Sequence, residues 1–270
     1  MTGPSARRWR GLAVLTVPLI VFLGLPVIAL AVRAILGGGL SRVLASRVVL
    51  DALALSLATT AVSLGFTLAL GTPLAYLLAR RRFRGSSIVE TIVDLPIVLP
   101  PSVAGLALLL VLGRRGLLGG ALDVVGISIP FTTVAVVLAQ VFVAAPFFIR
   151  SARAGIAAVD RDVEDAARVD GASEGDVFRW VTAPLAGAAL AAGAVMSWSR
   201  ALGEFGATIM FAGNIEGRTQ TLPLVVYSEF GGGDLDASIA AASILVLAAF
   251  GVLVSVRALR WGRALDTRGG

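Results

Sequence analysis

The sequence predicts an all-α integral membrane protein with six transmembrane helices. The chain has 270 residues, of which 57% are hydrophobic and 15% are charged, and its mean hydropathy is +0.91. A soluble domain carries about 25% charged residues. The apolar residues gather in long segments, and a helix needs about 20 of them to cross a bilayer. We therefore expect a single transmembrane domain over residues 1–270.

Six apolar segments are long enough to serve as spans. They lie at about 12–35, 53–79, 92–112, 129–149, 184–210 and 239–256. Six spans put both termini on the same side of the membrane. The first segment follows an arginine-rich start and contains Ala29-Leu30-Ala31, so a cleaved signal peptide is the alternative for it. Its apolar run is long for a signal peptide, and more membrane sequence follows.

The arginines predict the orientation. All 23 basic residues are Arg. With a cytoplasmic N-terminus, 16 of them fall in inner segments and five in outer loops, the asymmetry that the positive-inside rule requires. The inner set is Arg7, Arg8, Arg10, Arg80, Arg81, Arg82, Arg84, Arg150, Arg153, Arg161, Arg168, Arg179, Arg257, Arg260, Arg263 and Arg268, and the outer set is Arg42, Arg47, Arg114, Arg115 and Arg218. We expect a multi-pass protein of the cell membrane (inner or plasma membrane) with both termini in the cytoplasm.

Missing residue types exclude several kinds of chemistry. The chain has no Lys, His or Cys, so a phosphate-binding P-loop, a zinc site built from His or Cys, a histidine triad and a thiol nucleophile are all excluded. We expect no catalytic residue, no metal and no cofactor bound by this chain. A nucleic-acid partner is not expected either, because the arginines lie at helix ends and form no single patch.

A charged segment at about 150–183, between the fourth and fifth spans, contrasts with the apolar sequence around it. Asp160 can cap a helix start, Gly171 can end that helix, and Ser173 to Asp176 forms a capping box that opens a second helix before Pro184. The pattern predicts a helix-turn-helix at the cytoplasmic membrane surface, which we call the polar island. An amphipathic connector lying in the lipid interface is the alternative.

The polar island resembles the cytoplasmic "EAA" loop of ABC importer permeases. The resemblance rests on Asp165-Ala166-Ala167, Gly171, Val181 and Pro184. This chain has Asp where the family has Glu, with Glu164 beside it, and Ala183 where Leu is usual. The resemblance implies a type I importer permease fold, with an N-terminal helix at about 12–35 and a core at about 50–258. It also implies a coupling helix that inserts into an ATPase subunit through Glu164, Asp165, Ala166, Ala167, Arg168 and Gly171.

Three other segments are similar to the molybdate permeases of this family, namely residues 94–105, 200–214 and 218–224. Together the resemblance covers about residues 50–260. It implies the membrane subunit of an importer that moves molybdate, a tetrahedral oxyanion, by alternating access, with tungstate or sulfate as the alternative cargo. The implied partners are a second copy of the chain, a cytoplasmic ATPase that holds ATP and Mg, an extracytoplasmic molybdate-binding protein and the lipid bilayer. A secondary transporter or channel remains a remote alternative. It would need a proton- or ion-coupling site at mid-membrane, and the chain has no His and few acidic residues within its spans.

Span five carries polar side chains that are candidates for the translocation path. They are Ser197, Ser199, Arg200, Glu204 and Thr208. Arg200 and Glu204 are four residues apart, so they can pair on one helix face. Charges inside a span are costly and face a cavity or a partner. Arg200 therefore either attracts the anion or belongs to a structural ion pair.

Span three is interrupted by Pro96, Pro100 and Pro101. Three prolines this close remove backbone donors and disfavour a regular helix. The segment either kinks toward the pore, with Ser102 as a path candidate beyond the bend, or enters span three as a surface loop.

Overall fold

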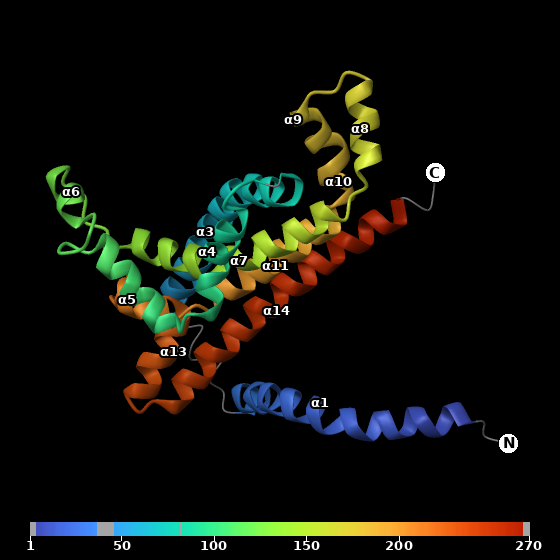
Figure 1. Ribbon diagram of the computed structural model, residues 1–270. Coiled ribbons are helices and arrows are strands. Elements are labelled where there is room, and N and C mark those ends of the chain that lie inside the picture. Colours follow the sequence, from blue (N-terminus) through green and yellow to red (C-terminus); the bar gives the residue numbers. More distant parts are fainter. Residues whose placement is uncertain (1–3, 37–45, 82, 267–270) are drawn as a thin grey trace.

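The computed structural model describes residues 4–36, 46–81 and 83–266, and their side chains between residues 16 and 251. These residues form helices and loops, with no strand in the described ranges (Figure 1). Arg42, Arg82 and Arg268, which entered the orientation argument, lie outside the described residues.

Among the described residues, three helices are long and apolar enough to cross a membrane: α1 (Pro4–Leu36), α3 (Arg47–Arg80) and α7 (Thr133–Ala157). By length and composition the number rises to five if each of two bent helix pairs is a single span. In the first, α4 (Ser86–Val98) meets α5 (Pro101–Leu112) at 120°, and in the second, Glu174–Leu185 meets α11 (Gly187–Leu202) at 77°. The sixth predicted span, 239–256, lies within α14 (Leu235–Asp266).

The interruptions follow from the sequence. The bend between α4 and α5 lies at Leu99 and Pro100, so the chain is helical on both sides of the proline interruption. The predicted fifth span is not continuous, because α11 ends at Leu202 and α12 (Gly206–Phe211) follows after three residues. Two short helices were not predicted, α6 (Gly119–Val124) and α13 (Leu222–Gly231).

The centre of the bundle is formed by α3, α7 and α11. Small residues allow their backbones to approach closely, as is usual between membrane helices. A Cβ atom added at Gly155 or Gly193 of this centre would lie less than 3.0 Å from side-chain atoms of Ala189 and Ser151, respectively. Gly71 of α3 meets the side chains of Phe148 and Ile149 in the same way, at 3.0 and 3.1 Å. These glycines therefore set the distance between the three helices.

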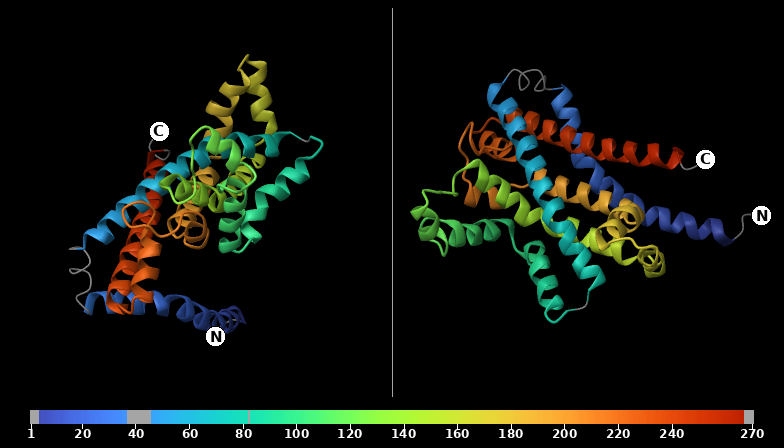
Figure 2. Two further views of the ribbon diagram at one scale, coloured as in Figure 1. Left: turned by 90° about the vertical axis from the view of Figure 1, so that its left-hand side faces the viewer. Right: turned by 90° about the horizontal axis from the view of Figure 1, so that it is seen from above.

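The two ends of the bundle differ. One end carries the polar island, built from α8 (Arg161–Val169), α9 (Glu174–Asp176), η1 (Val177–Thr182) and α10 (Ala183–Leu185). Figures 1 and 2 show that α1 begins and α14 ends toward this same end, whereas α6 and α13 lie at the other. We call these the island end and the opposite end.

Candidate coupling surface and translocation path

The caps predicted for the polar island are confirmed. The Asp160 side chain accepts a hydrogen bond from the Asp162 amide at 3.0 Å and starts α8. Gly171 has φ +93°, and the Ala172 amide donates to the Ala167 carbonyl at 3.0 Å, which ends the helix. Ser173 and Asp176 form a reciprocal capping box at the start of α9. Local sequence chemistry therefore fixes both helix boundaries.

Glu164 anchors the island to the membrane-spanning part. It is 1% exposed. Its Oε1 accepts hydrogen bonds from Arg80 Nη2 of α3 at 2.7 Å and from Thr182 Oγ1 at 2.5 Å. The same Arg80 nitrogen donates to the Val159 carbonyl at 3.1 Å. The Glu164 carboxylate thus faces α3, on the side of α8 away from its exposed residues. We call this cluster of Arg80, Glu164 and Thr182 the α3 clamp.

A second set of contacts lies nearer to solvent. Arg168 pairs with Asp165 at 2.6 Å and with Glu174 at 2.9 Å. The hydrogen bond from Arg168 is the main reason that the pKa of Glu174 is lowered from its usual value. The Tyr76 hydroxyl of α3 donates to Glu174 at 3.4 Å, and its ring meets the Phe178 ring edge-on with centroids 5.4 Å apart.

The outer face of α8 combines charged and apolar side chains. Asp165 and Ala166 are exposed, Ala167 and Arg168 are half-buried, and Gly171 is exposed at the helix end. Val163 and Val169 are 47% and 86% exposed in a helix whose other residues are charged or alanine. A Cβ atom at Gly171 would meet nothing within 4 Å in this chain. The face is therefore open to a protein partner.

The break after α11 is organised by Glu204, which is 1% exposed. Its Oε1 accepts a hydrogen bond from the Ala207 amide at 2.7 Å, which caps α12. Arg200 Nη1 lies 2.6 Å from its Oε2, without the alignment of a hydrogen bond. The predicted ion pair is therefore present, with the Arg200 side chain 27% exposed.

The remaining path candidates occupy different environments. Ser197 is buried and donates to the Ala144 carbonyl at 2.9 Å. The hydroxyl oxygens of Ser199 and Thr208 are buried and have no hydrogen-bond partner among the described residues. Ser102 is exposed at the start of α5. Its amide lies 3.2 Å from the position of a Cβ atom at Gly206, so the structure brings Ser102 next to the break that holds Glu204.

The close contact of α5 and α12 extends beyond this point. A Cβ atom at Gly105 would lie 2.5 Å from the Ala207 carbonyl oxygen, and one at Gly206 would lie 2.7 Å from the Pro101 side chain. The two short helices therefore share one backbone-to-backbone interface, and the bend in span three and the break in span five lie side by side.

Sequence reasoning missed a polar stripe along α3. Ser56, Thr59, Thr60, Ser63 and Thr67 are all buried. Thr59 Oγ1 accepts a hydrogen bond from Gln140 Nε2 at 3.1 Å, Thr60 Oγ1 accepts one from Trp198 Nε1 at 3.0 Å, and Ser56 Oγ accepts one from the Leu222 amide at 2.8 Å. Hydroxyl residues three and four apart inside an apolar span were the signal that could have predicted it.

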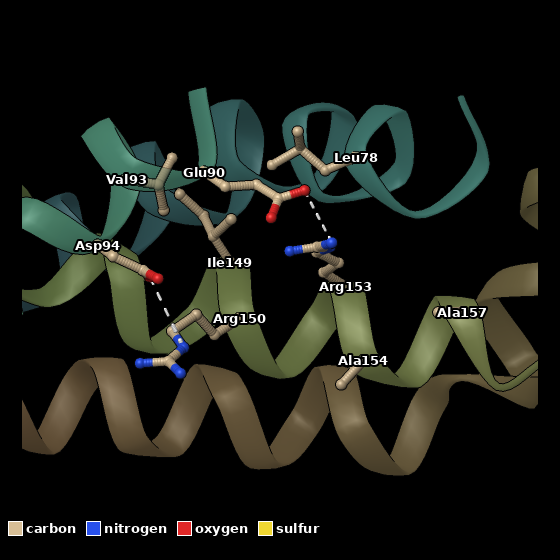
Figure 3. Close-up of a pocket in the computed structure, with 9 residues that line it drawn as sticks. All are labelled: Leu78, Glu90, Val93, Asp94, Ile149, Arg150, Arg153, Ala154 and Ala157. Carbon is tan, nitrogen blue, oxygen red and sulfur yellow. Dashed lines mark ion pairs between the residues drawn. The ribbon is translucent and has the colours of Figure 1, made fainter. Parts of the chain in front are cut away.

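A cavity of about 250 Å³ lies between α4 and α7 near the island end (Figure 3). Arg153 pairs with Glu90 at 2.8 Å and Arg150 with Asp94 at 3.7 Å across it. These ion pairs tie α4 to α7. Their charges cancel, so the cavity has no excess positive charge for an anion.

Comparison with known proteins identifies relatives over most of the chain. Residues 71–268 match the family model of the "binding-protein-dependent transport system inner membrane component". The chain is 41% identical to the Mycobacterium tuberculosis "molybdenum transport system permease protein ModB", over 92% of this chain and 93% of that protein. The Escherichia coli K12 protein of the same name is 38% identical over 76% of this chain and 91% of its own length.

Solved structures share the fold at lower identity. A bacterial ABC transporter involved in the import of the acidic polysaccharide alginate superposes with a TM-score of 0.77 at 18% identity, covering 94% of this chain and 96% of that one. The methionine ABC transporter MetNI in an inward-facing conformation superposes with a TM-score of 0.60 at 20% identity, covering 78% of this chain and 94% of that one.

Proposed function

Because the chain belongs to the family of binding-protein-dependent transport system inner membrane components, we propose that it is the membrane subunit of an ATP-driven molybdate importer. Its fold is that of the type I ABC importer permeases. The observation that carries the proposal is the 41% identity, over 92% of the chain, to a protein named for molybdenum transport. ATP and Mg would be held by a separate ATPase.

The polar island supports the link to that ATPase. The exposed face of α8, with Val163, Val169 and Asp165, is the docking surface on this proposal. The clamp between Glu164 and Arg80 ties this surface to α3, because both side chains are at least 92% buried and lie 2.7 Å apart. A displacement of the docked island would therefore move α3.

The proline break in span three supports a second copy of the chain as the partner that covers it. Pro96 lies inside α4 and has no amide hydrogen, so the Ile92 carbonyl loses its helical partner, and the end of α4 at Val98 leaves further carbonyls without one. Such backbone is tolerated at membrane depth only where protein or water covers it. A second copy of the chain, related by a twofold axis, would provide this cover and complete a path between the two copies.

Orientation and conformational cycle follow from the same assignment. The island end faces the cytoplasm on the arginine rule, and an extracytoplasmic binding protein delivers molybdate to the opposite end. ATP binding draws the two islands together, and the spans alternate between inward-open and outward-open states. The path candidates Ser102, Ser199, Arg200 and Thr208 lie at or near the breaks in spans three and five, where a gate would move.

Reconstitution tests this proposal. The chain is placed in proteoliposomes with its ATPase, and ATP hydrolysis and oxyanion uptake are measured with binding protein loaded with molybdate, tungstate or sulfate. We expect molybdate-loaded protein to stimulate both activities. If only sulfate-loaded binding protein stimulated ATP hydrolysis and uptake, the cargo would be sulfate and not molybdate. Uptake that needs no ATP would overturn the assignment to an ATP-driven importer.

A further inference from the structure

The opposite end of the bundle carries a hollow of about 450 Å³ between segments that are far apart in the sequence. Its lining residues are Arg114, Ser128, Pro130, Phe131, Thr132 and Arg218. Arg114 follows α5, Ser128 to Thr132 lead into α7, and Arg218 belongs to the loop between α12 and α13. We call this the outer hollow, because the proposed orientation puts it on the extracytoplasmic side.

Neither arginine of the outer hollow is neutralised by an ion pair with another described residue. The ion pairs formed between described residues involve Arg80, Arg150, Arg153, Arg168 and Arg200, and neither Arg114 nor Arg218 takes part in one. Both side chains are exposed. Glu216 lies two residues before Arg218 without pairing with it. Two exposed arginines therefore line one hollow and bring a combined charge of about +2 to it.

Hydrogen bonds fix the segments that line the hollow, so it is more than a gap between loops. Thr132 caps α7 by accepting a hydrogen bond from the Ala135 amide, so the positive end of a 25-residue helix meets it. Thr133 Oγ1 donates to the Arg218 carbonyl at 2.9 Å and fixes the loop that carries this arginine. Ser128 contributes an exposed hydroxyl.

Backbone strain at the same place supports a ligand role. Phe131 has φ +60°, the only positive φ of a non-glycine residue in the described part of the chain. Bulky residues adopt this conformation only where the surrounding structure imposes it, and such positions cluster at binding sites. The Phe131 amide donates to the Phe211 carbonyl at 3.3 Å, and its ring packs against Gly213. The hollow is thus held in shape by α12 as well as α7.

We propose that the outer hollow binds a tetrahedral dianionic oxyanion between Arg114 and Arg218. Two unpaired guanidinium groups match a charge of −2, and their planar forks present several donors to tetrahedral oxygens. A single side-chain carboxylate would neutralise only one of them. The site would concentrate the oxyanion at the mouth of the path, before it reaches the break at Glu204. The inference rests on the proposed orientation and cargo class.

Chemical modification of the arginines can test this site even if the oxyanion binds only weakly. The purified permease with its ATPase is treated with phenylglyoxal, and the modification of each arginine is quantified by mass spectrometry in millimolar molybdate or in chloride of equal ionic strength. Arg115 is the matched internal control, because it is exposed beside Arg114 and does not line the hollow. We expect molybdate to slow the modification of Arg114 and Arg218 and to leave Arg115 unchanged. Arg218→Gln should abolish the protection of Arg114, whereas Arg115→Gln should preserve it.

Three outcomes would overturn the proposal. Equal protection of Arg114 and Arg115 would indicate ionic screening only. Protection of Arg114 that survives Arg218→Gln would show that the two residues do not share a ligand. Protection by the binding protein without oxyanion would assign the arginines to protein docking. Molybdate uptake by the wild-type chain is measured separately in proteoliposomes, so failure of the hollow and failure of the transport function are told apart.

Discussion

Glu164→Gln should loosen the polar island although it removes no atom from the packing. The side chains of Glu164 and Arg80 are 2% and 8% exposed and lie 2.7 Å apart. Removing one partner of a buried ion pair costs about 3–5 kcal/mol, because the other charge stays buried. Two contacts remain in the variant, from Arg80 to the Val159 carbonyl and from Thr182 to the Gln oxygen. We therefore expect the lower limit, about 3 kcal/mol, which is about 100-fold in the equilibrium between docked and open island.

Hydrogen exchange measures this equilibrium directly. Amides of α8 and η1 should exchange up to about 100-fold faster in Glu164→Gln than in the wild type, while those in the first half of α3 should keep their rates. Asp165→Asn is the matched control, because it removes the neighbouring acid, whose pair with Arg168 is exposed. Exposed ion pairs contribute about 0–1 kcal/mol, so this control should change exchange by less than about tenfold.

A double variant decides whether the effect belongs to the pair. Arg80→Met with Glu164→Gln removes both charges, so the loss of stability should be smaller than the sum of the two single changes. Additive single effects would show that Arg80 and Glu164 act independently. Exchange in Glu164→Gln that matches the Asp165→Asn control would show that the α3 clamp does not hold the island.

Three further predictions concern the island and the span-five break. Gly171 has φ +93° with open space around it, so Ala and Leu should cost the isolated chain the same strain, about 1–2 kcal/mol. Only Gly171→Leu should also fail to retain the ATPase in a pull-down, because its larger side chain keeps the ATPase away from α8. Equal retention by the Ala and Leu variants would show that close approach at Gly171 is not needed for docking. Arg200→Met and Glu204→Gln should each lower the amount of assembled transporter, measured by size-exclusion chromatography. The double variant should restore it partly; if it also transports, Arg200 is structural. Arg168 lowers the pKa of Glu174, so ionised Glu174 stabilises the folded chain. This stabilisation is complete above about pH 4.3, the pKa of an unfolded Glu, and is lost as the pH falls through the lowered pKa of the folded state. Glu174→Gln should therefore lower the Tm at pH 7 and leave it unchanged at a pH below that lowered pKa. An unchanged Tm difference at low pH would contradict this.

Local signals made the membrane segments and the island caps predictable. Hydropathy over about 20 residues decides membrane burial wherever the partners lie. Asp160, Gly171 and Ser173 act within one helical turn of their own position, so their roles can be read from neighbouring residues. The Arg200 and Glu204 pair was predictable for the same reason, since four residues separate its members.

Contacts between distant segments could not be predicted in this way. Glu164 and Asp165 are adjacent acids, yet one is buried against α3 and the other exposed. The difference depends on Arg80, which is 84 residues away. The prolines of span three indicated irregular backbone, but they did not indicate the close contact of α5 with α12, which forms at Gly105 and Gly206 between segments about 100 residues apart. Neither glycine differs locally from the many others in the chain.

The polar contacts of α3 join the two ends of the bundle. At its island end Arg80 holds Glu164, along its length Thr60 binds Trp198 of α11, and near its start Ser56 binds the Leu222 amide of α13. A helix of 34 residues spans about 50 Å, and its own hydrogen bonds make it stiff along its axis. The hydroxyls add directional contacts where lipid-like packing alone would let the helices slide. On the proposed function, a force applied to α8 would be carried by one element to α13 at the opposite end, as a transporter requires whose ATPase and substrate entrance lie on different sides of the membrane.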